Sequence, residues 1–361
     1  MKKTIIWVVI ILIVIGAIVL VSRDSSKPVD DNAPIKIGAV YATTGAAAKF
    51  GELSVQGVRD AVDYFKETTG QSAEVIVEDS AGDSKQGVSA AQKLFGIDKV
   101  NFIVAGTSAI SAAIAPVAEG AKKLLISDAA LLGLTKDKHY VLQNFMPSLA
   151  DIPKQINNRA EWQKVAVVYI NDEFGNVWKQ NIGAGLDKQK TVESYSFEKT
   201  ATDYRTEAAK IKQFKPDAIV VLGYGPALNQ VLADISIAKI NSQIVGYLDC
   251  TLPGVLVDKR FSLEGQYSYE YPAINNEPIK SWMQTRNRGI NTFYALAFEN
   301  TLLSLIAAKN GDNNVDKAIE YLKNDSISGL WGEVKFGADG VVNRDLVMTR
   351  VENGQCVPVI K

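Results

Sequence analysis

The sequence predicts an α/β protein with two doubly wound parallel-sheet lobes, preceded by an N-terminal transmembrane or signal segment. Three observations support this fold class. From Ile35 onward, short β-rich runs alternate with segments of helical apolar spacing, which is typical of a parallel sheet covered by helices on both faces. The alternation starts again near Asp151 with its own set of core strands. The chain has 361 residues, 47% of them hydrophobic, which exceeds one typical domain and suffices for two cores.

The N-terminus has the features of a targeting segment. The apolar run Thr4–Val21 follows two lysines, which is the order of a secretory signal. The run is long enough to span a bilayer and no clean cleavage site follows it. We therefore expect residues 1–22 to be an uncleaved signal anchor, with a cleaved signal peptide as the alternative, and the rest of the chain to lie outside the cytoplasm. Residues 23–34 are polar with two prolines and predict a linker.

The first lobe is predicted from alternating strands and helices. Apolar residues recur at helical spacing in the helices, as at Val55, Val58 and Val62. The strands are expected at Ile35–Tyr41, Ala73–Glu78, Phe102–Ala105 and Leu124–Ile126, and the helices at Leu53–Lys66, from Asp83 or Ser84 to Leu94, and at Ile110–Ala121.

The second lobe repeats the pattern. Strands are expected at Val165–Ile170, Val192–Phe197, Ala218–Leu222 and Ile244–Tyr247, and helices at Asp151–Arg159, Gly175–Asp187, Tyr204–Phe214 and Ala227–Ala238. Two further helices are expected at Asn291–Lys309 and Val315–Lys323. Near the C-terminus, Gly332–Phe336 and Val341–Val351 flank the turn residues 338–340 and predict a hairpin.

The strongest candidate for a ligand site is the stretch that follows the strand 101–105. Gly106, Thr107 and Ser108 form a tight turn into an alanine-rich helix. A helix N-terminus leaves backbone N–H groups unpaired and attracts an anion such as a carboxylate. The alternative is that one of the two hydroxyls simply caps the helix, which is the commoner role of Ser and Thr at this position.

The composition and the motifs of the chain favour neither an enzyme nor a nucleic-acid-binding protein. The 39 basic and 40 acidic residues nearly balance, so no electrostatic footprint for nucleic acid is present. The single histidine, His139, lies in a charged loop, and two cysteines with one histidine do not make an ordinary zinc site. No G-x-G-x-x-G follows the first strand. We therefore expect no catalytic residue, no metal and no cofactor.

The two cysteines, Cys250 and Cys356, lie far apart in the sequence. A disulfide between them is permitted outside the cytoplasm, but nothing in the sequence requires it. We expect two unpaired cysteines packed in the protein.

An ordered series of short motifs resembles a known family. The series consists of Gly45, Phe50-Gly51, the helix Val55–Tyr64, Glu78-Asp79 with Asp83, Ala115–Ala118, Leu125–Ser127, Phe174-Gly175, Lys215–Ala218, Gly223-Tyr224 and Tyr294-Ala295. Together these motifs resemble the branched-chain amino-acid binding proteins of ABC transporters, the leucine/isoleucine/valine-binding type. The likeness extends from Ile35 to about Val351.

The resemblance implies a type I binding-protein fold, with two lobes, three crossings of the hinge, and a ligand held in the cleft between the lobes. The first lobe would comprise residues 34–150 and 271–330, and the second lobe residues 151–270. The tail 331–361 would cross back. A membrane permease would be the partner that receives the ligand from the closed form.

The resemblance also implies roles for residues on the first lobe. Ser108 matches a serine that holds the carboxylate of an amino acid, with Thr107 beside it as a further hydroxyl. Ala129 matches the residue whose carbonyl accepts from the ammonium group. Leu131 stands where the family has Thr or Ser, so one donor to the carboxylate is missing. Asp128 replaces a proline, and either a helix cap or a second acidic wall of the site is open for it.

On the second lobe, Tyr224 matches a tyrosine that closes over the ligand. Asp249 matches a glutamate that pairs with the ammonium group and is shorter by one methylene. Phe50, from the first lobe, and Phe174 match aromatic residues, usually tyrosine, that line the pocket. Without those two phenolic hydroxyls the cleft becomes more apolar, although aromatic residues taken alone are more often part of a core.

The expected function is therefore capture of a small ligand, an amino acid or a related molecule, by a protein held at the outer face of the membrane. Delivery to an ABC permease would follow hinge closure. Two alternatives remain open. The same fold serves as the ligand-sensing part of amide or urea receptors that act through a partner, and a lobe pair without ligand could act as an interaction module.

Overall fold

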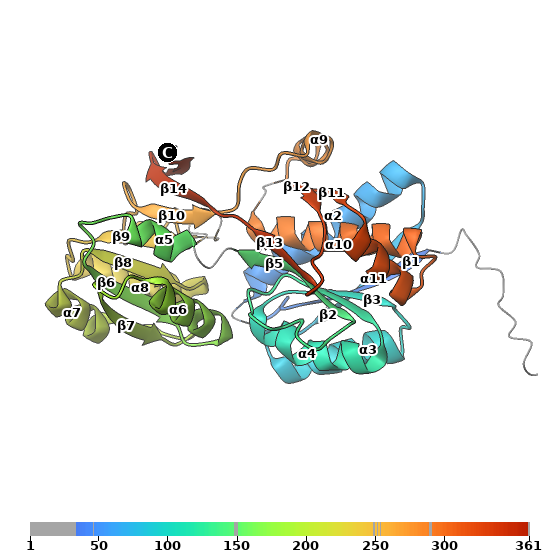
Figure 1. The fold of residues 1–361 in the computed structure, drawn as a ribbon, viewed down its shortest axis with the longest axis horizontal. Coiled ribbons are helices and arrows are strands. Elements are labelled where there is room, and N and C mark those ends of the chain that lie inside the picture. Colours follow the sequence, from blue (N-terminus) through green and yellow to red (C-terminus); the bar gives the residue numbers. More distant parts are fainter. Residues whose placement is uncertain are drawn as a thin grey trace, which may run out of the picture. The chain divides into compact units, whose positions relative to one another are not determined.

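The computed structural model describes residues 34–359 apart from residues 46, 148–150, 248–249, 251, 253 and 289–290 (Figure 1). The predicted signal anchor 1–22, all but the last residue of the linker 23–34, and the candidate Asp249 lie outside the described residues. Among the described residues, none of the helices combines the length and hydropathy that a membrane crossing requires.

The first sheet holds six strands among the described residues, in the order β13-β5-β4-β3-β1-β2, and every pair in it is parallel. Its strands are β1 (Ile35–Tyr41), β2 (Ala73–Asp79), β3 (Phe102–Ala105), β4 (Leu124–Ser127), β5 (Val141–Pro147) and β13 (Val341–Arg344). Parallel sheets are normally covered on both faces. The strand β1 shows this, because Ile37 and Ala39 are buried in the core on one face and Val40 is buried in the core on the other.

Helices cover both faces of this six-stranded sheet (Figure 1). They are α2 (Ala48–Thr69) and α10 (Thr292–Asn310) on one face, and α3 (Ser84–Gly96) and α4 (Ser108–Ala121) on the other. Two further helices, α9 (Glu277–Thr285) and α11 (Val315–Asn324), add buried residues to the core that α2 and α10 form. The α2 and α10 backbones approach closely at Gly57, where an added Cβ would lie 2.2 Å from the carbonyl oxygen of Tyr294. A side chain at residue 57 would therefore separate the two helices.

The second sheet holds seven strands among the described residues, in the order β15-β14-β10-β9-β8-β6-β7. Its strands are β6 (Lys164–Ile170), β7 (Thr191–Phe197), β8 (Ala218–Leu222), β9 (Gln243–Tyr247), β10 (Tyr267–Glu270), β14 (Val347–Glu352) and β15 (Gln355–Pro358). The first five run parallel, whereas β14 and β15 are antiparallel. Its helices are α5 (Asp151–Asn157), α6 (Glu173–Gly185), α7 (Arg205–Phe214) and α8 (Gly225–Ile237).

The chain passes between the elements of the two sheets after β5, after β10 and after β13. A buried polar cluster joins segments near these passages. Glu299 of α10 is fully buried and forms an ion pair with Arg344 at the end of β13. The side chain of Asn144, in β5, donates to the same carboxylate at 2.8 Å. Breaking one member of a buried ion pair costs about 3–5 kcal/mol, so the cluster fixes these segments to the first sheet.

The predicted C-terminal hairpin is wrong. The turn at residues 337–341 does form, with the Gly340 amide donating to the Gly337 carbonyl at 2.9 Å. Its flanking strands, however, pair elsewhere. The preceding strand β12 (Gly332–Val334) pairs with β11 (Ile327–Gly329), and β13 pairs in parallel with β5. The apolar residues of these strands are buried by distant partners, and the turn motif carries no information about those partners.

The expectation of two unpaired cysteines is also wrong. Cys250 and Cys356 form a disulfide, with their Cα atoms 6.0 Å apart. This bond ties the turn that follows β9 to the C-terminal strand β15. Because the two cysteines are 106 residues apart in the sequence, the cross-link constrains a large loop of the unfolded chain and is expected to contribute about 2–4 kcal/mol.

Candidate functional site

The turn between β3 and α4 is held in an unusual backbone conformation. Thr107 has φ 65° and ψ 145°, a region that residues with a side chain rarely adopt. Gly106 precedes it, and a Cβ there would lie 2.6 Å from the Tyr41 ring. Thr107 makes no side-chain capping bond to α4, and the hydroxyl of Ser108 makes no hydrogen bond within the described residues. The interpretation of these hydroxyls as simple helix caps therefore fails, and both remain available to a ligand.

A cavity of about 200 Å³ opens beside this turn, and elements of both sheets line it. From the first sheet come turns that follow the carboxyl ends of the strands, and from the second come the turns after β6, β8 and β9. Ligands of open parallel sheets bind at these ends. Six of the eight residues predicted for the site line the cavity: Phe50, Thr107, Ser108, Ala129, Phe174 and Tyr224.

Aromatic rings make up much of the apolar wall. Phe50 of α2 lies 4.8 Å from Phe293 of α10 between ring centroids, and its ring meets Tyr224 edge-on at 6.1 Å. Phe174, at the start of α6, contacts Tyr224 at 6.1 Å and Tyr247 at 5.7 Å. These rings join elements of the first sheet to elements of the second, so an apolar side chain in the cavity would contact both.

Asp128 directly follows β4 and faces the cavity. The Tyr41 hydroxyl donates to its Oδ2 at 3.3 Å, and the Thr107 amide donates to the same carboxylate. Burial raises the pKa of Asp128 to about 7, although these hydrogen bonds act in the opposite direction. Of the two alternatives left open for this residue, the acidic wall is the one that this geometry favours, because its carboxylate lies in the cavity lining.

Asp172, which sequence analysis missed, is the second described carboxylate of the cavity. It caps α6 by accepting from the Gly175 amide at 2.9 Å, and it accepts from the Tyr224 hydroxyl. Lys199 lies 3.7 Å from the same carboxylate. Burial, followed by the charge of Asp172, raises the pKa of the Tyr224 phenol well above its usual value, so the phenol stays protonated and donates. The signal in the sequence was a strand end followed by Asp at a helix start.

Ala129 and Leu131 differ in their placement. The buried Gln143 of β5 donates its side-chain amide to the carbonyl oxygens of both residues, at 3.1 Å for Leu131. Ala129 lines the cavity and its carbonyl oxygen keeps a second lone pair. The side chain of Leu131 does not line this cavity and instead borders a neighbouring surface hollow beside Asn171.

The remaining candidates lie elsewhere. His139 is exposed, and its Nε2 lies 3.5 Å from a carboxylate oxygen of Asp316 in α11. Cys250, Cys356 and Glu270 bring three potential metal ligands within 4.8 Å of one another. Because the two sulfur atoms are bonded to each other, they are not thiolates that could bind a metal ion.

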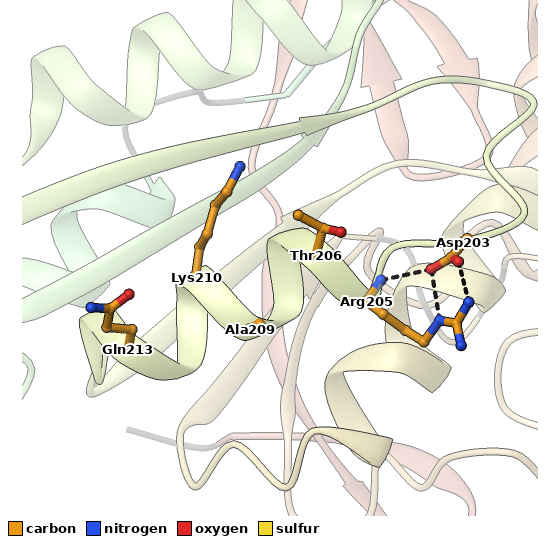
Figure 2. Close-up of a pocket in the computed structure, with 6 residues that line it drawn as sticks. All are labelled: Asp203, Arg205, Thr206, Ala209, Lys210 and Gln213. Atoms are coloured by element: carbon orange, nitrogen blue, oxygen red, sulfur yellow. Dashed lines mark hydrogen bonds and ion pairs between the residues drawn. The ribbon is translucent and has the colours of Figure 1, made fainter.

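A second hollow lies along α7 and Asp203, two residues before the helix, and Figure 2 shows its residues. Asp203 and Arg205 pair there, and both side chains are more than half exposed. Since one exposed helix and its preceding turn supply the whole lining, this hollow offers no enclosed site and no convergence of groups from different elements.

Comparisons with known proteins relate nearly the whole described chain to one family. The family model described as periplasmic binding protein matches residues 34–355. The Leu/Ile/Val-binding protein of Escherichia coli K12 is 22% identical over 324 residues, which cover 85% of this chain and 87% of the relative.

Two solved structures share the fold. A leucine-binding protein from Thermotoga maritima superposes with a TM-score of 0.82 at 18% identity, covering 90% of this chain and 98% of the other. A branched-chain amino-acid transporter substrate-binding protein from Streptococcus pneumoniae, in complex with isoleucine, superposes with a TM-score of 0.78 at 23% identity, covering 91% and 100%. At these identities the likeness establishes the type I binding-protein fold.

Proposed function

The chain belongs to the periplasmic binding protein family, and we propose that it captures an apolar amino acid of the leucine, isoleucine and valine class and delivers it to an ABC permease. The observation that carries this proposal is the cavity. It combines an unpaired helix N-terminus with free hydroxyls on one side, acidic side chains, and apolar rings from elements of both sheets. A zwitterion with an apolar side chain needs these three features together.

The carboxylate of the ligand binds at the N-terminus of α4. Ser108 donates its hydroxyl, and the unpaired amides of the first helical turn supply further donors in a region of partial positive charge. Leu131 offers no hydroxyl, so the α4 turn holds this end of the ligand nearly alone. The Ala129 carbonyl accepts from the ammonium group, and the resemblance to leucine-binding proteins assigns Asp249 as a further partner of that group.

The apolar side chain of the ligand packs against the rings of Phe50 and Phe174, and Tyr224 closes over it. The rings of Phe50 and Tyr224 already contact each other between elements of the two sheets, so a bound ligand adds area to that contact. Micromolar affinity corresponds to about 8 kcal/mol, enough to shift an equilibrium between open and closed forms.

The two lobes of this mechanism are residues 34–150 with 271–330, and residues 151–270, with 331–361 crossing back between them. The three passages of the chain act as the hinge. The protein works outside the cytoplasm, and residues 1–22 tether it to the membrane. It performs no chemistry on its ligand, and the closed form is what the permease recognises.

Calorimetry of the purified full-length protein, freed of any copurified ligand, tests this proposal against leucine, isoleucine, valine and, as a comparison, urea and short amides. We expect heat with at least one branched-chain amino acid and a smaller radius of gyration in scattering when it is present. Binding of amides alone would favour the sensing alternative. No heat with any amino acid would contradict the proposal.

A further inference from the structure

We propose that Asp128 makes the cleft selective for ligands that carry a positively charged amino group beside their carboxylate, by pairing with that amino group. This inference rests on the proposed function and adds a specificity-determining residue to it.

The position of Asp128 is the first support. It lines the cavity together with Ala129, the next residue in the chain, and lies close to Thr107, whose amide donates to it. A Cβ added to Gly106 would lie 2.9 Å from Asp128 Oδ1, so the carboxylate lies against the turn that leads into α4. A carboxylate group of a ligand and its neighbouring amino group would therefore meet Ser108 and Asp128 at the same time.

The second support is the missing counter-charge. Within the part of the chain that the structure describes, no ion pair joins Asp128 to a lysine or arginine, and its hydrogen-bond donors are a neutral phenol and neutral amides. The lysine in the cavity lining, Lys199, lies beside Asp172 instead. A carboxylate withdrawn from water without a counter-charge is costly, and a ligand ammonium group removes that cost.

The same argument disfavours a ligand that has only a carboxylate. Such a ligand would bring a second negative charge to the α4 turn, next to Asp128, with no positive charge between them. It would bind only when Asp128 takes up a proton. Specificity therefore comes from repulsion of the wrong ligand as well as from attraction of the right one.

The ionisable groups around Asp128 are either neutral phenols or members of ion pairs, so Asp128 is the group that we expect to change its protonation state near pH 7. Burial raises the pKa of Tyr41 and of Tyr271 well above the usual range, so both phenols are neutral. Arg344 and Glu299, near Tyr271, pair with each other. Asp172 and Lys199, in the cavity lining, form the other close pair.

These conditions predict opposite pH trends. The pKa of Asp128, raised to about 7 in the empty cavity, falls when an ammonium group lies beside it. Binding of an amino acid therefore releases a proton at low pH and weakens as the pH drops below about 7. Binding of a plain carboxylate takes up a proton and strengthens over the same range.

The test is calorimetry of the full-length protein with leucine and with 4-methylpentanoate, which is leucine without its amino group, near pH 6 and near pH 8. We expect a preference for leucine of about 10- to 100-fold near pH 8, and a leucine affinity about tenfold weaker near pH 6. We expect Asp128→Asn to lower leucine affinity by about 10- to 100-fold and to remove its pH dependence, while 4-methylpentanoate binds no more weakly than before.

Asp203→Asn, the same change on the exposed side chain of Figure 2, is the matched control and should leave both affinities unchanged. Circular dichroism shows whether Asp128→Asn folds. If it does not fold, the two pH trends of the unsubstituted protein decide the question. Equal affinity for the two ligands, parallel pH trends, or an unchanged preference in Asp128→Asn would overturn the role of Asp128 and leave the proposed function standing. If no amino acid binds, both fail.

Discussion

The two described carboxylates of the cavity, Asp128 and Asp172, have different surroundings. Asp172 caps α6, accepts from the Tyr224 hydroxyl and lies beside the Lys199 ammonium group. Among the residues that the structure describes, Asp128 accepts hydrogen bonds only from neutral donors, and burial raises its pKa to about 7. The partners of Asp172 all come from elements of the second sheet and include a lysine. No lysine or arginine among the described residues compensates the charge of Asp128. In our proposal, charge compensation rather than proximity to the cavity distinguishes the structural carboxylate, Asp172, from Asp128, the one assigned to the ligand.

The largest effect on stability is expected from Asp172→Ala. The substitution removes the cap of α6, which is worth about 1 kcal/mol, and leaves the half-buried Tyr224 hydroxyl without its acceptor, which costs about 1–3 kcal/mol more. We expect the free energy of unfolding in urea to fall by about 2–4 kcal/mol. Asp172→Asn keeps an oxygen that can cap the helix, so we expect its free energy of unfolding to fall by about half as much. Equal stability of Asp172→Ala and the unsubstituted protein would contradict a structural role.

Ser108→Ala should act on binding alone. Its hydroxyl has no hydrogen-bond partner within the described residues, so its loss leaves no buried group unsatisfied and the unfolding free energy should change by less than about 0.5 kcal/mol. Calorimetry should show a leucine affinity about 10- to 100-fold lower, the value of a hydrogen bond to a charged group. A stability loss as large as that of Asp172→Ala would instead assign this serine to the helix cap.

The pH dependence of stability should also separate the two carboxylates. The pKa of Asp128 is higher in the folded protein than in the unfolded chain, so the folded state binds more protons between about pH 4 and pH 7. The contribution of Asp128 to stability therefore falls as the pH rises through this range and is constant above it. Urea unfolding of the protein and of Asp128→Asn at several pH values isolates this contribution. A difference between the two curves that does not change with pH would contradict it.

The smallest effect is expected from Leu131→Thr. The resemblance to leucine-binding proteins predicts a hydroxyl here, but the Leu131 side chain borders the neighbouring hollow rather than the cavity. We expect leucine affinity to rise by less than about tenfold, by calorimetry, if closure brings the new hydroxyl to the carboxylate. Leu131→Val, which is smaller but apolar, is the control, and its leucine affinity should not rise above that of the unsubstituted protein.

Much of the fold was predictable because the strands β1, β3, β6 and β8 are short apolar runs buried on both faces. The strand β5 was missed because Gln143 and Asn144 interrupt its apolar pattern. Both side chains are buried, and both are satisfied by distant partners, the Ala129 carbonyl and the Glu299 carboxylate. A buried polar residue with a tertiary partner looks like an exposed one in the sequence.

The candidate site was predictable where strand ends meet the start of a helix, as at Ser108 and Phe174. Asp172 was missed because an Asp before a helix is normally a cap, and it does cap α6 while also lining the cavity. The positive φ of Thr107 and the lack of a counter-charge beside Asp128 could not be predicted. Both depend on packing around Tyr41 and Gly106, which a local sequence pattern does not encode. The predicted role of Asp249 stays a prediction.

A crystal structure of the protein with leucine tests the central claim most directly. We expect the leucine carboxylate within hydrogen-bond distance of the Ser108 hydroxyl and the α4 amides, the amino group between the Ala129 carbonyl and Asp128, and the side chain against Phe50 and Phe174. Leucine bound outside this cavity, or with its carboxylate directed at Lys199 and its amino group away from Asp128, would contradict the account.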